Sequence, residues 1–205
     1  MRTLGEIPAP AATPLRAGTL RRVDQEAFDR LLGELDGVRV ALVTGDRRRK
    51  RAAAAGLASA AAAAGIGTAL LECDLDLPTL AEDLGLALAP GLSEYLRGEV
   101  AAARILQPLV LAGPGSAAAG EPLVCVVAGR PSEDGEALLA SDRFRQAVAG
   151  LRDAHELVVI EGPPSSATGA LAAAARCVEA TLLCLASGEE APALPVAIAG
   201  LIRQV

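Results

Sequence analysis

Large aromatic side chains are almost absent from this sequence. Of its 205 residues, 1% are aromatic, with no tryptophan, one tyrosine and two phenylalanines. Hydrophobic residues nevertheless make up 52% of the chain, which argues against a disordered protein and is enough to form a core. Leucine, valine and alanine must fill that core. A core without large rings needs closely packed layers, so we expect a sheet between helices.

Basic residues are fewer than acidic residues, and closely spaced cysteine pairs are absent from the sequence. The sequence has 19 lysines and arginines against 25 aspartates and glutamates, a formal net charge of −6. This balance argues against nucleic acid as a partner, because a nucleic-acid-binding protein carries a basic surface. The four cysteines form no Cys-x-x-Cys pair; they are Cys73, Cys125, Cys177 and Cys184. We therefore expect buried free thiols and a reducing compartment.

The sequence shows neither a signal peptide nor a good membrane span. Its start has no charged stretch followed by an apolar run. Residues 52–71 are uncharged and follow five basic residues, which imitates a span and its flank. Alanine and glycine dominate this run, however, and Gly65 and Gly67 divide it into a helix and a strand. We expect no membrane insertion and a cytoplasmic location.

Short apolar runs alternate with helical patterns along most of the chain. Residues 1–22 are rich in proline, alanine and threonine without a period and are expected to form a flexible tail, so that one domain covers residues 23–205. Predicted strands are 38–44, 68–71, 123–127, 157–160 and 180–185. Predicted helices are 25–35, 52–64, 79–84, 92–97, 141–154, 168–176 and 194–205. The alternation predicts an α/β fold with a parallel sheet covered by helices on both faces.

The segment after the first predicted strand has part of the pattern of a phosphate-binding loop. Gly45 is followed by a basic run that contains Lys50 and Arg51 and leads into an alanine-rich helix. A working loop needs glycines, whose backbone N–H groups curl around phosphate, and a serine or threonine after the lysine to bind Mg²⁺. Both are missing here. Judged by this motif alone, the run is a basic, solvated start of a helix.

Two observations nevertheless place Lys50 in a former phosphate site. It is the only lysine, against eighteen arginines, and it stands where the loop lysine belongs. Basic residues at a helix N-terminus oppose the helix dipole, so a negative partner should lie beside them. Glu72 and Asp74 end the second strand and Glu161 ends the fourth, at the edge where ligands of parallel sheets bind. Each alone could be an exposed acidic turn, but together they predict a site, since such carboxylates hold Mg²⁺ in phosphoryl-transfer enzymes.

Five segments, in order, resemble one protein family. They are residues 25–31 (QEAFDRL), 69–80 (ALLECDLDLPTL), 90–99 (PGLSEYLRGE), 138–144 (LLASDRF) and 157–164 (LVVIEGPP). They are similar to the EAFR-x-L assembly helix and the LLIDADLRRPSL, PGLSDVLxGE, ELLxSxRF and VVIDTPP segments of the bacterial tyrosine autokinases of exopolysaccharide synthesis, which are deviant P-loop ATPases. The resemblance runs from about Gln25 to Glu190 and implies a P-loop NTPase-like fold. It assigns the assembly helix the residues Glu26, Phe28, Leu31 and Leu32.

The departures from this family concern the nucleotide site. Arg47 and Arg49 stand at glycine positions, and Arg51 replaces the hydroxyl that binds Mg²⁺. Glu72 and Glu161 stand where the family has aspartate. The predicted last helix leaves no final strand, and the C-terminal tyrosine cluster that the family phosphorylates is missing. We expect Arg51 to replace the metal by bridging the carboxylates.

The resemblance and the departures together give the expected function. The family implies ATP and Mg²⁺ as ligands, with Asp74 and Glu161 as the residues that would hold the metal, but the altered loop predicts weak or lost binding. We expect a non-catalytic relative that acts as an interaction or regulatory subunit. Its partner would be a second copy or a membrane chain-length regulator, which would bring it to the inner face of the membrane. A weak ATP-binding kinase or ATPase is the alternative, and so is a purely structural assembly protein.

Overall fold

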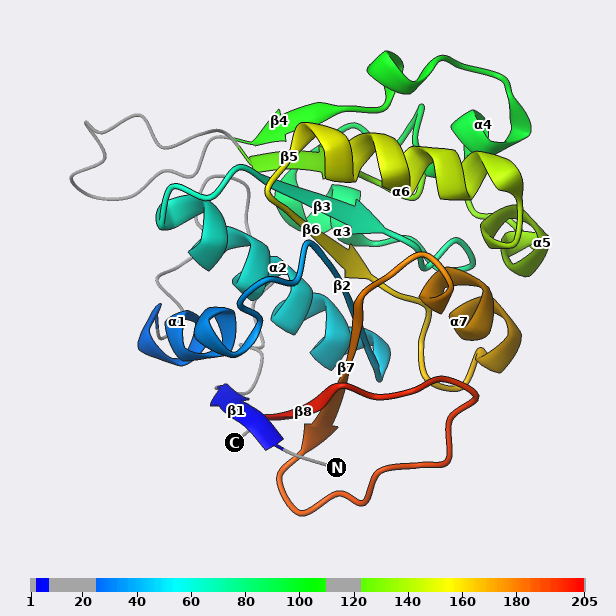
Figure 1. The fold of residues 1–205 in the computed structure, drawn as a ribbon. Helices are drawn as coiled ribbons and strands as arrows, with labels where there is room; N and C mark the ends of the chain where they lie inside the picture. The colour runs from blue at the N-terminus through cyan, green and yellow to red at the C-terminus, as the bar shows by residue number, and fades with distance from the viewer. Residues whose placement is uncertain (1–2, 8–24, 110–122, 205) are drawn as a thin grey trace.

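The computed structural model describes residues 3–7, 25–109 and 123–204. The strands in these ranges form one sheet in the order β1-β8-β7-β2-β6-β3-β5-β4 (Figure 1). They are β1 Thr3–Ile7, β2 Val40–Gly45, β3 Thr68–Glu72, β4 Gln107–Leu109, β5 Leu123–Val126, β6 Leu157–Glu161, β7 Ala180–Ala186 and β8 Gly200–Gln204. Neighbouring strands are parallel except β4, which is antiparallel to β5. The sheet is therefore mostly parallel, as the sequence predicts.

Helices cover both faces of this sheet. The α-helices are α1 Gln25–Glu34, α2 Arg47–Ala63, α3 Leu80–Leu84, α4 Leu92–Arg97, α5 Gly135–Leu139, α6 Asp142–Ala154 and α7 Thr168–Ala175, with a 3₁₀ turn at Ala102–Arg104. Successive side chains of a strand point to opposite faces. Ala41 and Val43 of β2 accordingly join one buried cluster with α1, α2 and α3, whereas Val40 and Leu42 join a second cluster with α4 to α7.

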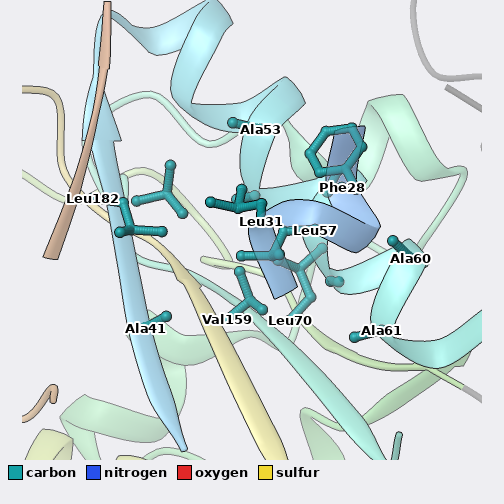
Figure 2. Close-up of a cluster of buried hydrophobic side chains, with 14 of the residues drawn as sticks. Phe28, Leu31, Ala41, Ala53, Leu57, Ala60, Ala61, Leu70, Val159 and Leu182 are labelled. Carbon is teal, nitrogen blue, oxygen red and sulfur yellow. The ribbon is translucent and has the colours of Figure 1, made fainter. Parts of the chain in front are cut away.

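Helix α2 packs against β2, β3 and β6 and is itself covered by α1. Its buried apolar residues are mostly alanines: Ala53, Ala54, Ala55, Ala58, Ala60, Ala61 and Ala62. Phe28 and Leu31 of α1 point into the same cluster as Leu57 of α2 (Figure 2). The apolar face of α1 is thus buried within the chain, with Leu32 partly buried beside it and Glu26 exposed.

The structure corrects the expected end of the chain. Residues 194–205 were expected to form a helix, but Gly200–Gln204 is strand β8, paired in parallel with β7. The pairing of this segment with β7 overrides its helical pattern. The apolar pair Leu201 and Ile202 is buried beside β7 instead. The final strand that seemed to be missing is therefore present.

The expected beginning of the chain needs a correction as well. Thr3–Ile7 lies in the predicted flexible tail, yet it forms strand β1 and pairs in parallel with β8. Leu4 packs over Gly200, where an added Cβ would lie 2.2 Å from its Cγ. The rest of the predicted tail, residues 1–2 and 8–22, lies outside the described residues. Within the described ranges, no helix is long and apolar enough to cross a membrane.

Three of the four cysteines are buried free thiols, as the sequence predicts. All four are free thiols. Cys73, Cys125 and Cys184 are buried and Cys177 is partly exposed. Burial raises the pKa of Cys125 to about 12, which keeps this thiol protonated and unreactive at neutral pH.

Candidate functional site

Strand β2 leads into α2 through a connection shorter than a phosphate-binding loop. Gly45 has a φ of +145°, and an added Cβ would lie 2.5 Å from the carbonyl oxygen of Cys184, so glycine is required there. Helix α2 begins at Arg47 rather than at Ala52, where the sequence predicts its start. Four residues separate Gly45 from Lys50, whereas five separate the first glycine from the lysine in the phosphate-loop pattern. The chain has no room for a wide loop at this point.

Two N–H groups at the start of α2, those of Arg49 and Lys50, are already used within the helix. Asp46 is the N-cap, and its Oδ1 accepts a 2.9 Å hydrogen bond from the Arg49 amide. The Lys50 amide donates to the Asp46 carbonyl oxygen at 3.0 Å. A helix N-terminus favours a negative group, and here the carboxylate of Asp46 supplies it. These amides are therefore not arranged around a phosphate.

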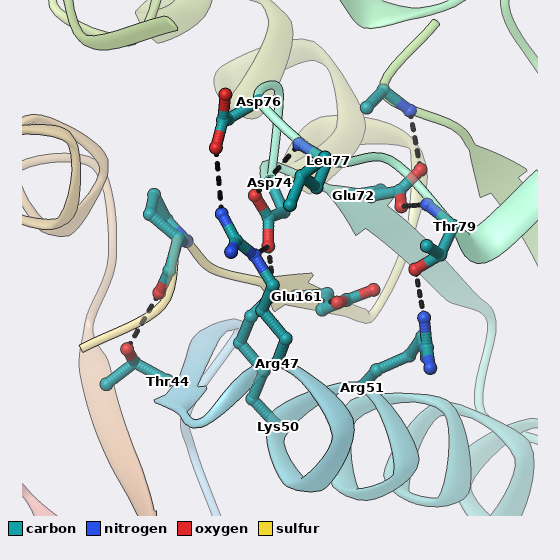
Figure 3. Close-up of polar contacts among 12 residues, drawn as sticks. Thr44, Arg47, Lys50, Arg51, Glu72, Asp74, Asp76, Leu77, Thr79 and Glu161 are labelled. Atoms are coloured by element: carbon teal, nitrogen blue, oxygen red, sulfur yellow. Dashed lines mark hydrogen bonds and ion pairs between the residues drawn. The ribbon is translucent and has the colours of Figure 1, made fainter. Parts of the chain in front are cut away.

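Lys50 lies at the centre of the site, with its side chain 0% exposed. Its Nζ is 2.7 Å from Glu161 Oε1 and 3.2 Å from Asp74 Oδ2 (Figure 3). The two carboxylates come from the ends of β6 and β3, which are neighbours in the sheet. The structure thus brings Lys50, Asp74 and Glu161 together at the carboxyl edge, where the sequence places them.

Glu72 lies near this group but serves a different purpose. Its Oε1 accepts hydrogen bonds from the amides of Thr79 at 2.7 Å and Leu80 at 2.9 Å, and its Oε2 accepts one from Ala128 at 2.9 Å. Burial raises the pKa of Glu72, and these three amides partly offset that rise. Glutamate is one methylene longer than the aspartate of the resembled family, so it can reach the first residues of α3. Glu72 therefore binds backbone amides of the chain rather than a ligand.

Arg47 makes the contact that was expected of Arg51. Its Nε is 3.0 Å from Asp74 Oδ2, and its Nη2 is 2.9 Å from Asp76 Oδ2 (Figure 3). A hydrogen bond to Asp74 is the main cause that raises the pKa of Arg47. Residues three apart lie on the same face of a helix, so the spacing between Arg47 and Lys50 could have indicated this contact from the sequence.

The expected bridge from Arg51 to the strand-end carboxylates is wrong. Arg51 lies one turn further along α2 than Arg47, beside α3. Its Nε is 2.8 Å from Asp83 Oδ2, and its Nη1 donates to Thr79 Oγ1. Asp76, Thr79 and Asp83 were not singled out from the sequence, because none follows a strand directly.

The side chains present do not fit Mg²⁺ held as in a phosphoryl-transfer site. Asp74 Oδ2 is shared by Arg47 and Lys50, and Glu161 Oε1 is taken by Lys50. Within the described ranges, the buried Glu161 Oε2 has no hydrogen-bond partner. One unshared glutamate oxygen, with an arginine in place of the hydroxyl, is a poor donor set for a hard cation. Burial outweighs the attraction of Lys50 and raises the pKa of Glu161 to about 7.

A cleft of about 370 Å³ opens beside Arg47. It lies between the segments that follow β3 and β6 and the N-terminal ends of α5 and α7. Asp74, Asp76, Glu133 and Glu136 line it, and Arg47 is the only basic residue of the described chain in its wall. Such an acidic lining repels a nucleotide triphosphate.

Comparison with known proteins agrees with this architecture. No protein-family model and no curated protein matches the sequence. The kinase domain of the Escherichia coli tyrosine kinase ETK superposes with a TM-score of 0.83 at 20% identity, covering 100% of this chain and 90% of that one. The BceF tyrosine kinase domain superposes with a TM-score of 0.79 at 21% identity, covering 100% and 93%. This chain has the P-loop NTPase fold of the bacterial tyrosine kinase domains.

The same fold occurs in proteins with bound nucleotide. Cobyrinic acid a,c-diamide synthase from Mycobacterium smegmatis, with a bound ATP analogue and magnesium, superposes with a TM-score of 0.60 at 19% identity over 80% of this chain and 70% of that one.

Proposed function

We propose that this chain is a non-catalytic relative of the bacterial tyrosine kinases, which uses the kinase fold as an interaction or regulatory subunit in exopolysaccharide assembly. One observation carries the proposal: Lys50, the lysine that should bind phosphate, is fully buried and held by Asp74 and Glu161. In phosphoryl transfer, this lysine and the loop amides position the phosphates and neutralise their charge. In this chain the Lys50 side chain and the amides of Arg49 and Lys50 are already engaged within the protein.

The start of α2 supports the loss of nucleotide binding independently. Asp46 places a carboxylate at the helix N-terminus, where an anionic phosphate would otherwise bind. Arg51, which stands where the Mg²⁺-binding hydroxyl belongs, is paired with Asp83. A triphosphate would have to displace the Asp46 cap, break the Lys50 ion pairs and lie beside an acidic cleft.

The partner is proposed to be a second copy of the chain or a membrane chain-length regulator, at the inner face of the membrane. The resemblance of residues 25–31 to an assembly helix supports this choice. Because Phe28 and Leu31 are buried against α2, the contact would use the outer face of α1. That face presents the charged residues Glu26, Asp29 and Arg30.

A nucleotide titration tests the loss of binding. The melting temperature of the purified chain is measured with millimolar ATP, with and without Mg²⁺, and an active tyrosine kinase domain of the same fold serves as the control. We expect the control to be stabilised and this chain to be unchanged, because a ligand stabilises only the state that it binds. A Mg²⁺-dependent rise in its melting temperature, confirmed by calorimetric binding, would overturn the proposal.

A phosphorylation assay tests the loss of catalysis separately. Tyr95 is the only tyrosine; it is partly exposed, and the Arg143 guanidinium lies 5.6 Å from its ring centre. After incubation with Mg²⁺ and ATP, we expect no phosphotyrosine on this chain or on an added tyrosine-rich peptide. Phosphotyrosine that disappears in Lys50→Met would show that the chain is a kinase.

A further inference from the structure

We infer that Arg47 acts as a built-in cation that stabilises the strand-end carboxylates. In relatives with an intact loop, a metal would do this. Removal of Arg47 therefore turns this edge of the sheet into a divalent-cation site. The inference rests on the proposed function. It concerns five side chains that follow one another with alternating charge: Glu161, Lys50, Asp74, Arg47 and Asp76 (Figure 3).

Asp74 is a buried carboxylate that needs a cation beside it. Its side chain is 4% exposed, so water can stabilise its charge only slightly, and a buried charge must be paired. Arg47 and Lys50 both contact its Oδ2, at 3.0 Å and 3.2 Å. Lys50 also serves Glu161, so one lysine would have to neutralise two carboxylates if Arg47 were absent.

The shape of arginine suits this position. Asp74 and Asp76 repel each other when both are charged, and a guanidinium can bind two carboxylates at once through its planar fork of donors. Arg47 does so with Nε on Asp74 and Nη2 on Asp76. Its side chain is 43% exposed and that of Asp76 is 71% exposed, so the outer pair contributes little. The inner contact with Asp74 is the one that matters for stability.

Removal of the guanidinium would expose oxygen ligands beside an open volume. The cleft is lined by Arg47, Asp74 and Asp76. Without Arg47, both aspartates would face this space. Carboxylate oxygens together with water are the ligands that Mg²⁺ and Mn²⁺ prefer. The Arg47 side chain occupies the space in which a cation would bind, and it therefore excludes the cation.

The chain contains a matched control for this test. Arg49 also lies in the first turn of α2, and its side chain is 32% exposed. It pairs with Asp46 at 3.1 Å and with Glu189 at 3.6 Å, away from Asp74. Arg49→Ala removes the same charge and the same side-chain length from the same helix without touching the carboxylate group.

The experiment compares the melting temperatures of the parent, Arg47→Ala and Arg49→Ala in EDTA and in millimolar Mg²⁺ or Mn²⁺, without nucleotide. We expect Arg47→Ala to melt a few degrees below Arg49→Ala in EDTA and to regain at least half of the difference with either cation. The parent and Arg49→Ala should not respond. Calorimetry should detect Mn²⁺ binding to Arg47→Ala, and Asp74→Asn added to it should abolish that binding.

Two results would overturn the inference: equal melting of the two arginine variants in EDTA, or no response of Arg47→Ala to either cation. If Arg47→Ala does not fold, Arg47→Gln retains the volume and removes the charge, and the same two criteria apply to it. Arg47→Lys, which keeps the charge, should remain indifferent to metal. Because no nucleotide is present, a failure here is separate from a failure of the proposed function, which the ATP titration decides on the parent chain.

Discussion

The ring of Phe28 lies directly over the backbone of Gly56. A Cβ added to Gly56 would be 2.2 Å from Phe28 Cζ, closer than real contacts allow. The two residues join α1 to α2 (Figure 2 shows Phe28 in its cluster), and Phe28 is one of only two phenylalanines in the chain. In a core built of small side chains, this aromatic contact fixes where α1 lies.

A double-mutant cycle on this pair should therefore show strong coupling. Phe28→Ala should lower the free energy of unfolding by about 3–5 kcal/mol, as for other buried phenylalanines. Gly56→Ala should also destabilise the chain, because the ring has no room to remain. With the ring removed, the added methyl group fits, so the double variant should be less destabilised than the sum of the two. Additive effects in chemical denaturation would show that the ring does not depend on Gly56.

Association through α1 should depend on its outer, charged face. Glu26→Arg with Asp29→Arg should leave the melting temperature nearly unchanged, because exposed substitutions rarely alter stability by more than ~0.5 kcal/mol. The same pair should change the mass in solution, or the binding of a chain-length regulator, if α1 is an assembly helix. Light scattering after gel filtration measures the mass, with Glu99→Arg as an exposed control. Phe28→Asp is not a suitable test, since it would unfold the core.

The carboxylate of Glu72 should be among the most important for stability. Glu72→Ala leaves two buried backbone amides and one partly buried amide without an acceptor, and each unsatisfied buried group costs about 1–3 kcal/mol. Glu72→Asp should be intermediate, because the shorter side chain cannot reach both α3 and Ala128. Urea denaturation should rank the parent above Glu72→Asp and Glu72→Ala lowest. An aspartate variant as stable as the parent would mean that the extra methylene has no structural purpose.

Glu161 should make the chain less stable as the pH rises from about 4.5 to about 7. Its pKa in the folded chain is raised to about 7 by burial, so across this range the folded state binds more protons than the unfolded state. Stability then falls with rising pH, by at most about 1.4 kcal/mol per pH unit for one proton. Glu161→Gln should remove this slope and leave the contributions of the other carboxylates. Parallel stability curves for the parent and the variant between pH 4.5 and 7 would contradict the assignment.

The pairing of strand β1 with β8 should depend on Gly200, against which Leu4 packs. Gly200→Val places a branched side chain where Leu4 now packs, since even a Cβ would lie 2.2 Å from Leu4 Cγ. We expect β1 to detach from β8 while the centre of the sheet remains folded. Hydrogen exchange should then show faster exchange for residues 3–7 and unchanged protection in β2 and β6. Equal protection of β1 in the variant would show that the strand tolerates the clash.

The centre of the fold could be predicted from the sequence because its signals are local. All five predicted strands are runs of apolar residues, and they correspond to β2, β3, β5, β6 and β7; α6 was predicted within one residue. The edge strands β1 and β4 and the strand β8 beside β1 were not found in this way. Strand β1 pairs with residues about 200 positions away, and a short strand such as TLGEI carries no strong pattern of its own.

The site was predicted in part for a similar reason. Lys50, Asp74 and Glu161 follow from strand ends, which topology brings to one edge. The choice among neighbouring arginines does not follow from topology. Arg47 and Arg51 differ by about one helical turn, and the predicted start of α2 was five residues late. With the helix starting at Arg47, its side chain faces Asp74 and that of Arg51 faces α3.

The alanines of α2 also affect the entropy of folding. Burial of a long side chain freezes its rotamers, at about 0.5–2 kcal/mol each, whereas alanine has no rotamers to lose. Seven of the buried residues of α2 are alanines, Ala53, Ala54, Ala55, Ala58, Ala60, Ala61 and Ala62, so the helix becomes ordered against the sheet with little loss of side-chain freedom. The same helix has little tolerance for change, because any larger residue at these positions must push the sheet and the helix apart. In a library of all single substitutions of the chain, the positions that tolerate substitution least should therefore be the buried alanines of α2.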